Sequence, residues 1–429
     1  MKILYISYFY PPLGGPAVLR NLKTVRYLSE AGAKITLITI DEIEYAYWDP
    51  SLNSLCSEER LIRTPSWDPM ALMRKVFGKN KSTSGYIYKR SPESLKLFLR
   101  RLYPIDDKIG WLPHLMKAGR KAMQAEAFDL IYVSCGPFSS AIAAYKLAEE
   151  FRLPLVVDYR DYWTLLSDYD LMGNPLKRRH NRAWESRILR RADLIVSATK
   201  GIADDLAEHF DPQIKDKSFL LFNGHDEADF EDLPQERPSS DFYSLAYFGN
   251  IYARRSLKYL YRAIEEMDRE GLIPAKLRIR LYGNFNRELY DEIAHSGIKE
   301  RISVHDQVPH RDALIKMQKA DALILIINSS SPKGTLTSKI FEYLRLGRPI
   351  LAMVPPKSEA ADLLRECGVH SICPMESISA IKSCLSRLFD QRHQAPGLAP
   401  ALAKYERKAQ VQELSKRLEK LISSKDPKS

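Results

Sequence analysis

The chain has 429 residues, of which 45% are hydrophobic and 28% are charged. These proportions are ordinary for a globular protein, and the length predicts two domains of about 200 residues each. No apolar run reaches the roughly 18–20 residues that cross a bilayer, and residues 1–7 are too short and too β-branched for a secretory signal. The sequence therefore excludes a membrane-spanning protein, and we expect a cytoplasmic one.

The cysteines and the charges narrow the choice of partners. Five cysteines are scattered along the chain without a Cys-x-x-Cys pair or a histidine at metal-ligand spacing, which favours unreactive free thiols in a reducing compartment over a metal site.

The net charge is +11, and residues 60–121 hold 15 Lys and Arg against 4 Asp and Glu, an excess of 11. A localised basic surface indicates an anionic partner, such as a phosphorylated substrate, acidic lipid headgroups or nucleic acid.

The first half of the chain alternates short apolar strands with helical patterns, which is typical of parallel βαβ units. A helix is expected over 17–31, after a Pro/Gly loop. The expected strands are 2–7, 34–40, 130–134, 153–158, 193–197 and 219–222.

The strand and helix pattern restarts after an acidic, Pro- and Ser-containing stretch at 227–243, which we interpret as a linker. A helix is expected near 257–270, and a charged amphipathic helix over 401–422. The expected strands are 245–249, 276–282, 302–305, 322–327 and 349–354. The predicted parts are a Rossmann-like domain at 1–226, a second one at 227–395, and a segment at 396–429 whose helix packs back on the first domain.

Residues 43–110 fit the alternating scheme least well, because they show few strand signals and many basic and aromatic residues. We interpret them as a basic insertion. Within it, 94–103 is a short basic amphipathic stretch. It is either a helix that packs on the domain or an element that contacts a membrane surface or an acceptor.

Two motifs carry candidate chemistry. Gly14 and Gly15 lie between the first strand and the first helix, where bare backbone amides can approach an anion. The Gly-x-Gly-x-x-Gly pattern is absent, which disfavours a nicotinamide dinucleotide.

The second motif spans 333–350, where Thr337 and Ser338 precede a helix that stops at Gly347. Lys339 and Glu342 are three residues apart and therefore share one helix face. Lys339 could bind a diphosphate and Glu342 could accept hydrogen bonds from ribose hydroxyls. A solvated ion pair between the two is the alternative.

Taken in order, several sequence pieces resemble the family 4 glycosyltransferases of the GT-B fold, over roughly 1–40 and 107–425. These pieces are Tyr8-Phe9-Tyr10-Pro11-Pro12 with Gly14-Gly15 and Arg20, Asp158-Tyr159-Arg160-Asp161-Tyr162-Trp163, Tyr247-Phe248-Gly249-Asn250, and Phe341-Glu342-Tyr343-Leu344 with Gly347-Arg348-Pro349-Ile350. The resemblance implies two Rossmann-like domains facing a cleft, a nucleotide-diphosphate sugar as donor, and transfer with retention of anomeric configuration.

The resemblance also implies residue roles. Gly14, Gly15, Gly249, Asn250, Thr337, Ser338 and Glu342 would bind the donor, and Glu342 matches the family's ribose-binding glutamate. The leaving diphosphate would be stabilised by Lys339 and by Arg254 or Arg255. Such cations leave no need for a metal or another cofactor.

This sequence departs from the family pattern at two places. Gly334 stands where many members carry a second glutamate that contacts the donor sugar, which leaves the sugar open. The Asp158–Trp163 stretch replaces a common histidine and resembles a branch that acts on polysaccharide intermediates. We expect Asp158, Arg160 and Trp163 on the acceptor side and Asp161 in the cleft, with a structural Arg160–Asp161 or Asp158–Arg160 pair as the alternative.

The remaining histidines have no partnered spacing and are expected to be structural or exposed: His114, His180, His225, His305 and His310. The leading hypothesis is therefore a glycosyltransferase of envelope polysaccharide synthesis. It would act on a glycan or lipid-linked acceptor in the cytoplasm, with peripheral contact to the inner face of an anionic membrane. A GT-B nucleotide-sugar 2-epimerase and a non-catalytic family member are the alternatives. A nucleic-acid partner is disfavoured because no known motif accompanies the charge.

Overall fold

The computed structural model describes residues 1–41, 43, 48–68, 103–166, 174–234, 241–251, 255–390 and 399–424. The chain forms two compact units. Unit 1 consists of Met1–Phe222 and Lys408–Ser429, and unit 2 consists of Asn223–Arg407. Each unit is described by itself below.

Unit 1 is built on a seven-stranded sheet in the order β3-β2-β1-β4-β5-β6-β7, in which every pairing is parallel. Its strands are β1 (Lys2–Ile6), β2 (Lys34–Ile40), β3 (Arg60–Thr64), β4 (Leu130–Ser134), β5 (Leu155–Tyr159), β6 (Leu194–Ser197) and β7 (Ser218–Leu220). Its helices are α1 (Pro16–Glu30), α5 (Leu112–Ala125), α6 (Ser139–Phe151), α8 (Pro175–Arg191), α9 (Lys200–His209) and α16 (Arg407–Ser423).

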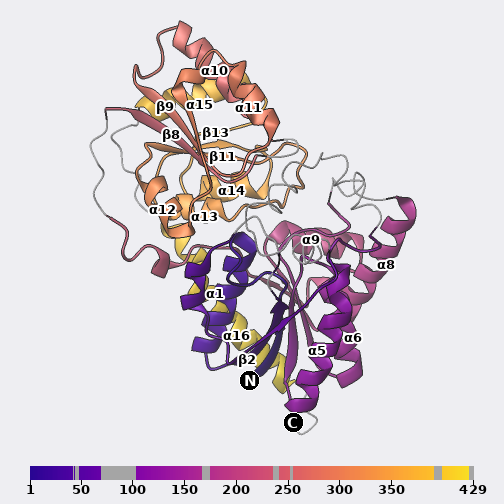
Figure 1. The fold of residues 1–429 in the computed structure, drawn as a ribbon. Coiled ribbons are helices and arrows are strands. Elements are labelled where there is room, and N and C mark those ends of the chain that lie inside the picture. Colours follow the sequence, from indigo (N-terminus) through magenta and orange to yellow (C-terminus); the bar gives the residue numbers. More distant parts are fainter. Residues whose placement is uncertain are drawn as a thin grey trace. The chain divides into compact units, whose positions relative to one another are not determined.

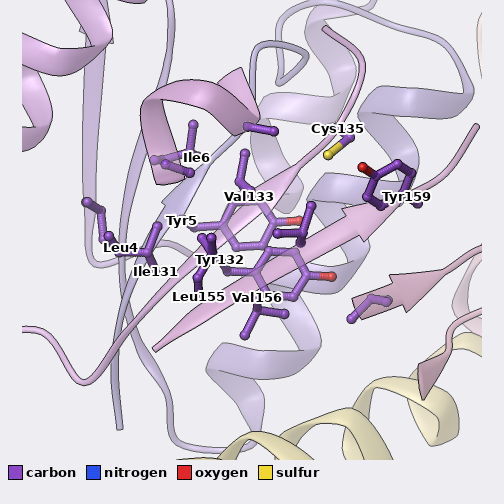
Figure 2. Close-up of a cluster of buried hydrophobic side chains, with 14 of the residues drawn as sticks. Leu4, Tyr5, Ile6, Ile131, Tyr132, Val133, Cys135, Leu155, Val156 and Tyr159 are labelled. Carbon is purple, nitrogen blue, oxygen red and sulfur yellow. The ribbon is translucent and has the colours of Figure 1, made fainter. Parts of the chain in front are cut away.

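Helices α1 and α16 lie on one side of this sheet, and α5, α6 and α8 lie on the other (Figure 1). Strands covered on both faces read as nearly continuous apolar runs, as β1 and β4 do. Tyr5 and Tyr132 stack in the centre, with ring centroids 4.7 Å apart, and both hydroxyls point the same way (Figure 2). The last helix contributes Val411, Leu414 and Leu418 to this core, so it is part of unit 1.

Unit 2 repeats the architecture with a six-stranded parallel sheet in the order β10-β9-β8-β11-β12-β13. Its strands are β8 (Tyr243–Phe248), β9 (Leu277–Tyr282), β10 (Ile302–His305), β11 (Ala322–Ile326), β12 (Ile350–Met353) and β13 (Ile372–Cys373). Its helices are α10 (Lys258–Arg269), α11 (Arg287–Ala294), α12 (His310–Gln318), α13 (Lys339–Arg345), α14 (Glu359–Glu366) and α15 (Ile378–Asp390). Helices α10, α11 and α15 cover one face, and α12, α13 and α14 the other (Figure 1). Two Rossmann-like α/β units with parallel sheets confirm the expected fold class.

The structure differs from the sequence-based prediction in two places. The 43–110 segment supplies a sheet strand, β3, which pairs with β2 along its whole length. The amphipathic stretch at 94–102 lies outside the described residues. The expected linker at 227–243 begins as a folded part of unit 2, because Glu227 forms a bidentate ion pair with Arg345, with Oε2 2.6 Å from Nη2. Among the helices that the structure describes, none is long and apolar enough to span a membrane.

Candidate active site

In unit 2, the candidate site begins where β8 ends, at Gly249. This residue has φ 117°, and its amide donates to the Tyr282 carbonyl at 2.8 Å. A Cβ on Gly249 would lie only 2.6 Å from Cε of Lys339. Glycine is therefore required twice, for the positive φ and for the close approach of the lysine from α13.

Lys339 is half-buried and has its ammonium 4.8 Å from the centre of the Tyr247 ring. Burial and, to a smaller extent, the charge of Arg255 lower the pKa of Lys339 to about 7, against an opposing effect of Glu342. Among the described residues, no carboxylate forms an ion pair with this ammonium. A desolvated cation beside an aromatic face and a second cation is an arrangement that an anionic ligand would stabilise.

Glu342 lies one turn further along α13, and its Oε1 is 2.9 Å from Nε2 of His310 at the start of α12. Their side chains are only 16% and 21% exposed. The alternative of a solvated Lys339–Glu342 ion pair is therefore wrong. We expected His310 to be structural or exposed, and the sequence did not predict its contact with Glu342. Glu342 is 32 residues away from His310 in the sequence, and the return of the chain through β11 brings the two side chains together. A contact over this separation cannot be predicted from sequence spacing.

The remaining donor-side candidates divide by their contacts. Thr337, two residues before α13, has a buried hydroxyl without a hydrogen-bond partner in the described structure. Ser338 precedes the helix and makes no side-chain capping bond. The side-chain oxygen of Asn250 already has a backbone partner, because its Oδ1 accepts a hydrogen bond from the Asn284 amide at 3.1 Å. Arg254 lies outside the described residues.

In unit 1, Gly14 and Gly15 lead into α1. Gly15 has φ 99°, and apart from its two chain neighbours no atom of the described residues lies within 4 Å of the place where its Cβ would be. The loop before it is held by Arg63 of β3, whose Nη2 donates to the Pro11 carbonyl at 2.5 Å and whose Nη1 donates to the Ile40 carbonyl at 3.3 Å. The N-terminus of a 15-residue helix is thus presented with open space beside it.

Asp158 is fully buried and forms a bidentate ion pair with Arg20 of α1, at 2.7 and 3.0 Å. It also accepts from the Tyr132 hydroxyl at 3.1 Å, while Arg20 donates to the Leu221 carbonyl at 2.7 Å. Asp158 therefore joins α1, β4 and β5, and it has no free face for an acceptor. Its expected acceptor role and its alternative pairing with Arg160 are both wrong, because Arg20 takes the carboxylate.

The side chains that follow Asp158 point in different directions. Asp161 is 74% exposed, with Oδ2 3.5 Å from Nε of Arg160. Arg160 lies over the Phe9 ring at 5.3 Å and donates to the Gly136 carbonyl at 3.2 Å. Trp163 is buried and stacks on Phe138, with centroids 4.8 Å apart. Arg160 and Asp161 are thus the members of this loop that a ligand can reach at the carboxyl edge of the sheet.

Solved structures of known proteins match the chain over nearly its whole length. HepE (Alr3699) of Anabaena in complex with UDP and glucose is 14% identical, with a TM-score of 0.61, covering 98% of this chain and 100% of that one. A glycosyltransferase of Rickettsia africae is 12% identical, with a TM-score of 0.61 and 98% of both chains covered. The fold is GT-B.

The same GT-B fold is shared with an epimerase. The UDP-GlcNAc 2-epimerase of Methanocaldococcus jannaschii is 11% identical, with a TM-score of 0.56, covering 98% of this chain and 100% of that chain. A family model described as a glycosyl transferase 4-like domain matches residues 80–215, within unit 1. No curated protein matched the sequence. Residues 80–215 are therefore similar to a glycosyl transferase 4-like domain, within a chain of GT-B fold.

Proposed function

We propose that this protein is a retaining glycosyltransferase that transfers a sugar from a nucleotide-diphosphate donor. The observation that supports this most is the Lys339 ammonium, which lies against Gly249 without a carboxylate partner in the described structure and one helical turn from Glu342. The site lies at the carboxyl end of β8, where parallel α/β sheets bind their ligands.

The chemistry follows from these charges. Lys339 and Arg255 neutralise the diphosphate as it leaves, and the Thr337 hydroxyl supplies a further donor. Charge stabilisation of this kind is strongest in a site with restricted water. Glu342 accepts hydrogen bonds from the ribose hydroxyls, and His310 orients its carboxylate. With two cations on the diphosphate, transfer needs no metal ion or other cofactor.

On the acceptor side we place Asp161 and Arg160, with the Gly14–Gly15 backbone beside the phosphates or the acceptor. An exposed carboxylate at the end of β5 suits a hydroxyl nucleophile. Acceptors of this chemistry are a glycan or a lipid-linked intermediate of an envelope polysaccharide, assembled on the cytoplasmic side of the membrane. Gly334 leaves the choice of donor sugar open.

A donor screen by mass spectrometry tests the proposal. The full-length protein is incubated with nucleotide-diphosphate sugars and acceptor extracts in the presence of EDTA. Release of free nucleotide with a glycosylated acceptor is the expected result. The structural likeness to an epimerase supplies the second candidate, and an intact but epimerised nucleotide sugar would establish it. Binding of no nucleoside diphosphate would overturn both.

Glu342→Ala is expected to weaken nucleoside diphosphate binding roughly ten- to hundredfold, because a hydrogen bond to a charged group contributes about 1.5–3 kcal/mol. Titration calorimetry measures this change. Glu300→Ala, an exposed acid of the same unit, is the matched control and should bind normally. Unchanged affinity of the Glu342 variant would remove the ribose-binding assignment.

Peripheral contact with an anionic membrane is proposed through α8. This helix carries seven Lys and Arg residues and one acid, Glu185, which is fully buried, and Leu176 at its start is 78% exposed. Arg179→Gln/Arg190→Gln should weaken binding to phosphatidylglycerol vesicles roughly thirtyfold, at about 1 kcal/mol per cation. The control Lys34→Gln/Lys215→Gln removes the same charge elsewhere on unit 1 and should bind normally in co-sedimentation. An equal loss in both variants would contradict a specific role for α8.

A further inference from the structure

Unit 2 contains a cavity of about 340 Å³ between α12 and strands β8 and β9. It lies on the face of the sheet opposite the main apolar core. Leu245, Ile279 and Leu281 belong to that core, and the residues between them face the cavity. The cavity is lined by Ser244, Ala246, Arg280, Tyr282, Asp312, Ile315, Lys316 and Lys319.

The position of this cavity differs from that of the donor site. Ser244 is the second residue of β8, and Lys319 directly follows α12. Lys339 approaches the opposite end of β8, at Gly249. Neither Lys339 nor Glu342 lines the cavity. A ligand held there would therefore be a different one from the nucleotide sugar.

The charges around the cavity are unbalanced. Arg280, Lys316 and Lys319 are three cations, and Asp312 is the one carboxylate in the lining. Across the part of the chain that the structure describes, none of the three cations forms an ion pair with a carboxylate. The lining thus carries a net charge of about +2, which matches a phosphomonoester of charge about −1.5 to −2 near pH 7.

A buried hydroxyl indicates where such a ligand would bind. Ser244 is 3% exposed, and its Oγ has no hydrogen-bond partner among the described residues. Its backbone amide is already used, donating to Oδ2 of Asp321 at 2.8 Å. A buried hydroxyl without a partner is unfavourable, and a phosphate oxygen in the cavity would accept from it.

The rest of the wall is apolar and aromatic. Tyr282 stacks between Phe248 and His305, with centroids 4.8 and 4.7 Å away, and the Lys316 ammonium lies 5.6 Å from its ring centre. The cations of the cavity also act on His305. Partial burial lowers the pKa of this histidine, and the charges of Arg280 and Lys316 lower it as well. The volume lies within the range of small-molecule sites and exceeds what a bare phosphate needs.

We propose that this cavity binds a phosphomonoester of a small polar molecule, such as a sugar phosphate. The phosphate group is held by Arg280, Lys316, Lys319 and the Ser244 hydroxyl. The remainder of the molecule lies against Tyr282 and Ile315. The inference does not depend on the proposed transferase activity.

Titration calorimetry on the full-length protein with glucose 6-phosphate, inorganic phosphate and glucose tests this site. Glucose 6-phosphate should bind more tightly than inorganic phosphate, and glucose should not bind. Lys316→Gln/Lys319→Gln should weaken glucose 6-phosphate binding about tenfold or more, because two charge-assisted hydrogen bonds are lost. Ser244→Ala should weaken it about fivefold.

Two control variants distinguish binding in this cavity from non-specific attraction and from binding in the donor site. Lys276→Gln/Lys299→Gln removes the same net charge from exposed positions of unit 2 and should bind normally. Lys339→Met disables the donor site and should also bind normally. Equal weakening in both lysine pairs would overturn the proposal in favour of non-specific attraction. Loss confined to Lys339→Met would place the anion in the donor site. Absence of binding, or equal affinity for the two phosphates, would overturn the phosphomonoester assignment.

Discussion

Lys339→Met is expected to lower the rate of sugar transfer by about two to three orders of magnitude, the usual effect of removing one preorganised donor from a developing negative charge. The methionine replaces the lysine stem as far as Cε and keeps its packing against Gly249 and Tyr247, so that chiefly the cation is lost. Steady-state kinetics with the donor identified by the screen measures the change. Lys333→Met, at an exposed position in the loop before α13, is the matched control and should retain activity.

The same lysine predicts a dependence of donor binding on pH. With a pKa of about 7 in the folded protein, Lys339 loses its proton as the pH rises through 7. Nucleoside diphosphate affinity should therefore fall between pH 6 and pH 8.5. Lys339→Arg keeps its charge over this range and should show little of this fall. An equal decline in both proteins would show that another group is responsible.

The stability of the Lys339→Met variant should not fall. The pKa of Lys339 is lowered from 10.5 in the folded protein, so between pH 7 and 10.5 the unfolded chain binds more protons than the folded chain does. The free energy of unfolding therefore rises with pH over this range. At and below neutral pH the buried ammonium destabilises the fold. Removing it relieves that cost. Urea denaturation at pH 7 would show this, and a large loss of stability would mean that the lysine has a structural role instead.

Asp158→Ala is expected to lower the free energy of unfolding of unit 1 by about 3–5 kcal/mol, because it leaves the Arg20 guanidinium buried without its partner. The pair is 2% and 0% exposed at its two ends and ties α1 to β5. Urea denaturation followed by circular dichroism measures the loss. Asp161→Ala removes a 74% exposed carboxylate three residues away and should change stability by less than about 0.5 kcal/mol.

A double variant distinguishes the effect of the Arg20–Asp158 ion pair on stability from the effect of side-chain packing at the same place. Arg20→Met/Asp158→Leu replaces both charges with apolar groups and should recover part of the stability lost in Asp158→Ala, since no isolated charge remains. If Asp158→Ala alone were as stable as the wild type, the ion pair would not be what holds α1 against the sheet.

The sequence by itself determined the α/β class and most of the elements. Apolar runs such as 130–134 and 322–326 are buried on both faces, and the Pro/Gly loop before α1 and the small residues before α13 mark where helices begin. It also singled out Lys339 and Glu342, because a spacing of three residues places both on one helix face, and the family resemblance added Gly249.

Only the tertiary structure decided which polar groups meet. Arg20 reaches Asp158 across 138 residues, and His310 reaches Glu342 across 32, so neither pair has a local signature. β3 was missed because two of its five residues are arginines, Arg60 and Arg63, and it is an edge strand, whose pairing is set by β2 rather than by its own hydrophobicity. The order of the strands in a sheet decides which elements come into contact, and this order differs from the order of the strands along the chain. It cannot be predicted from one sequence alone.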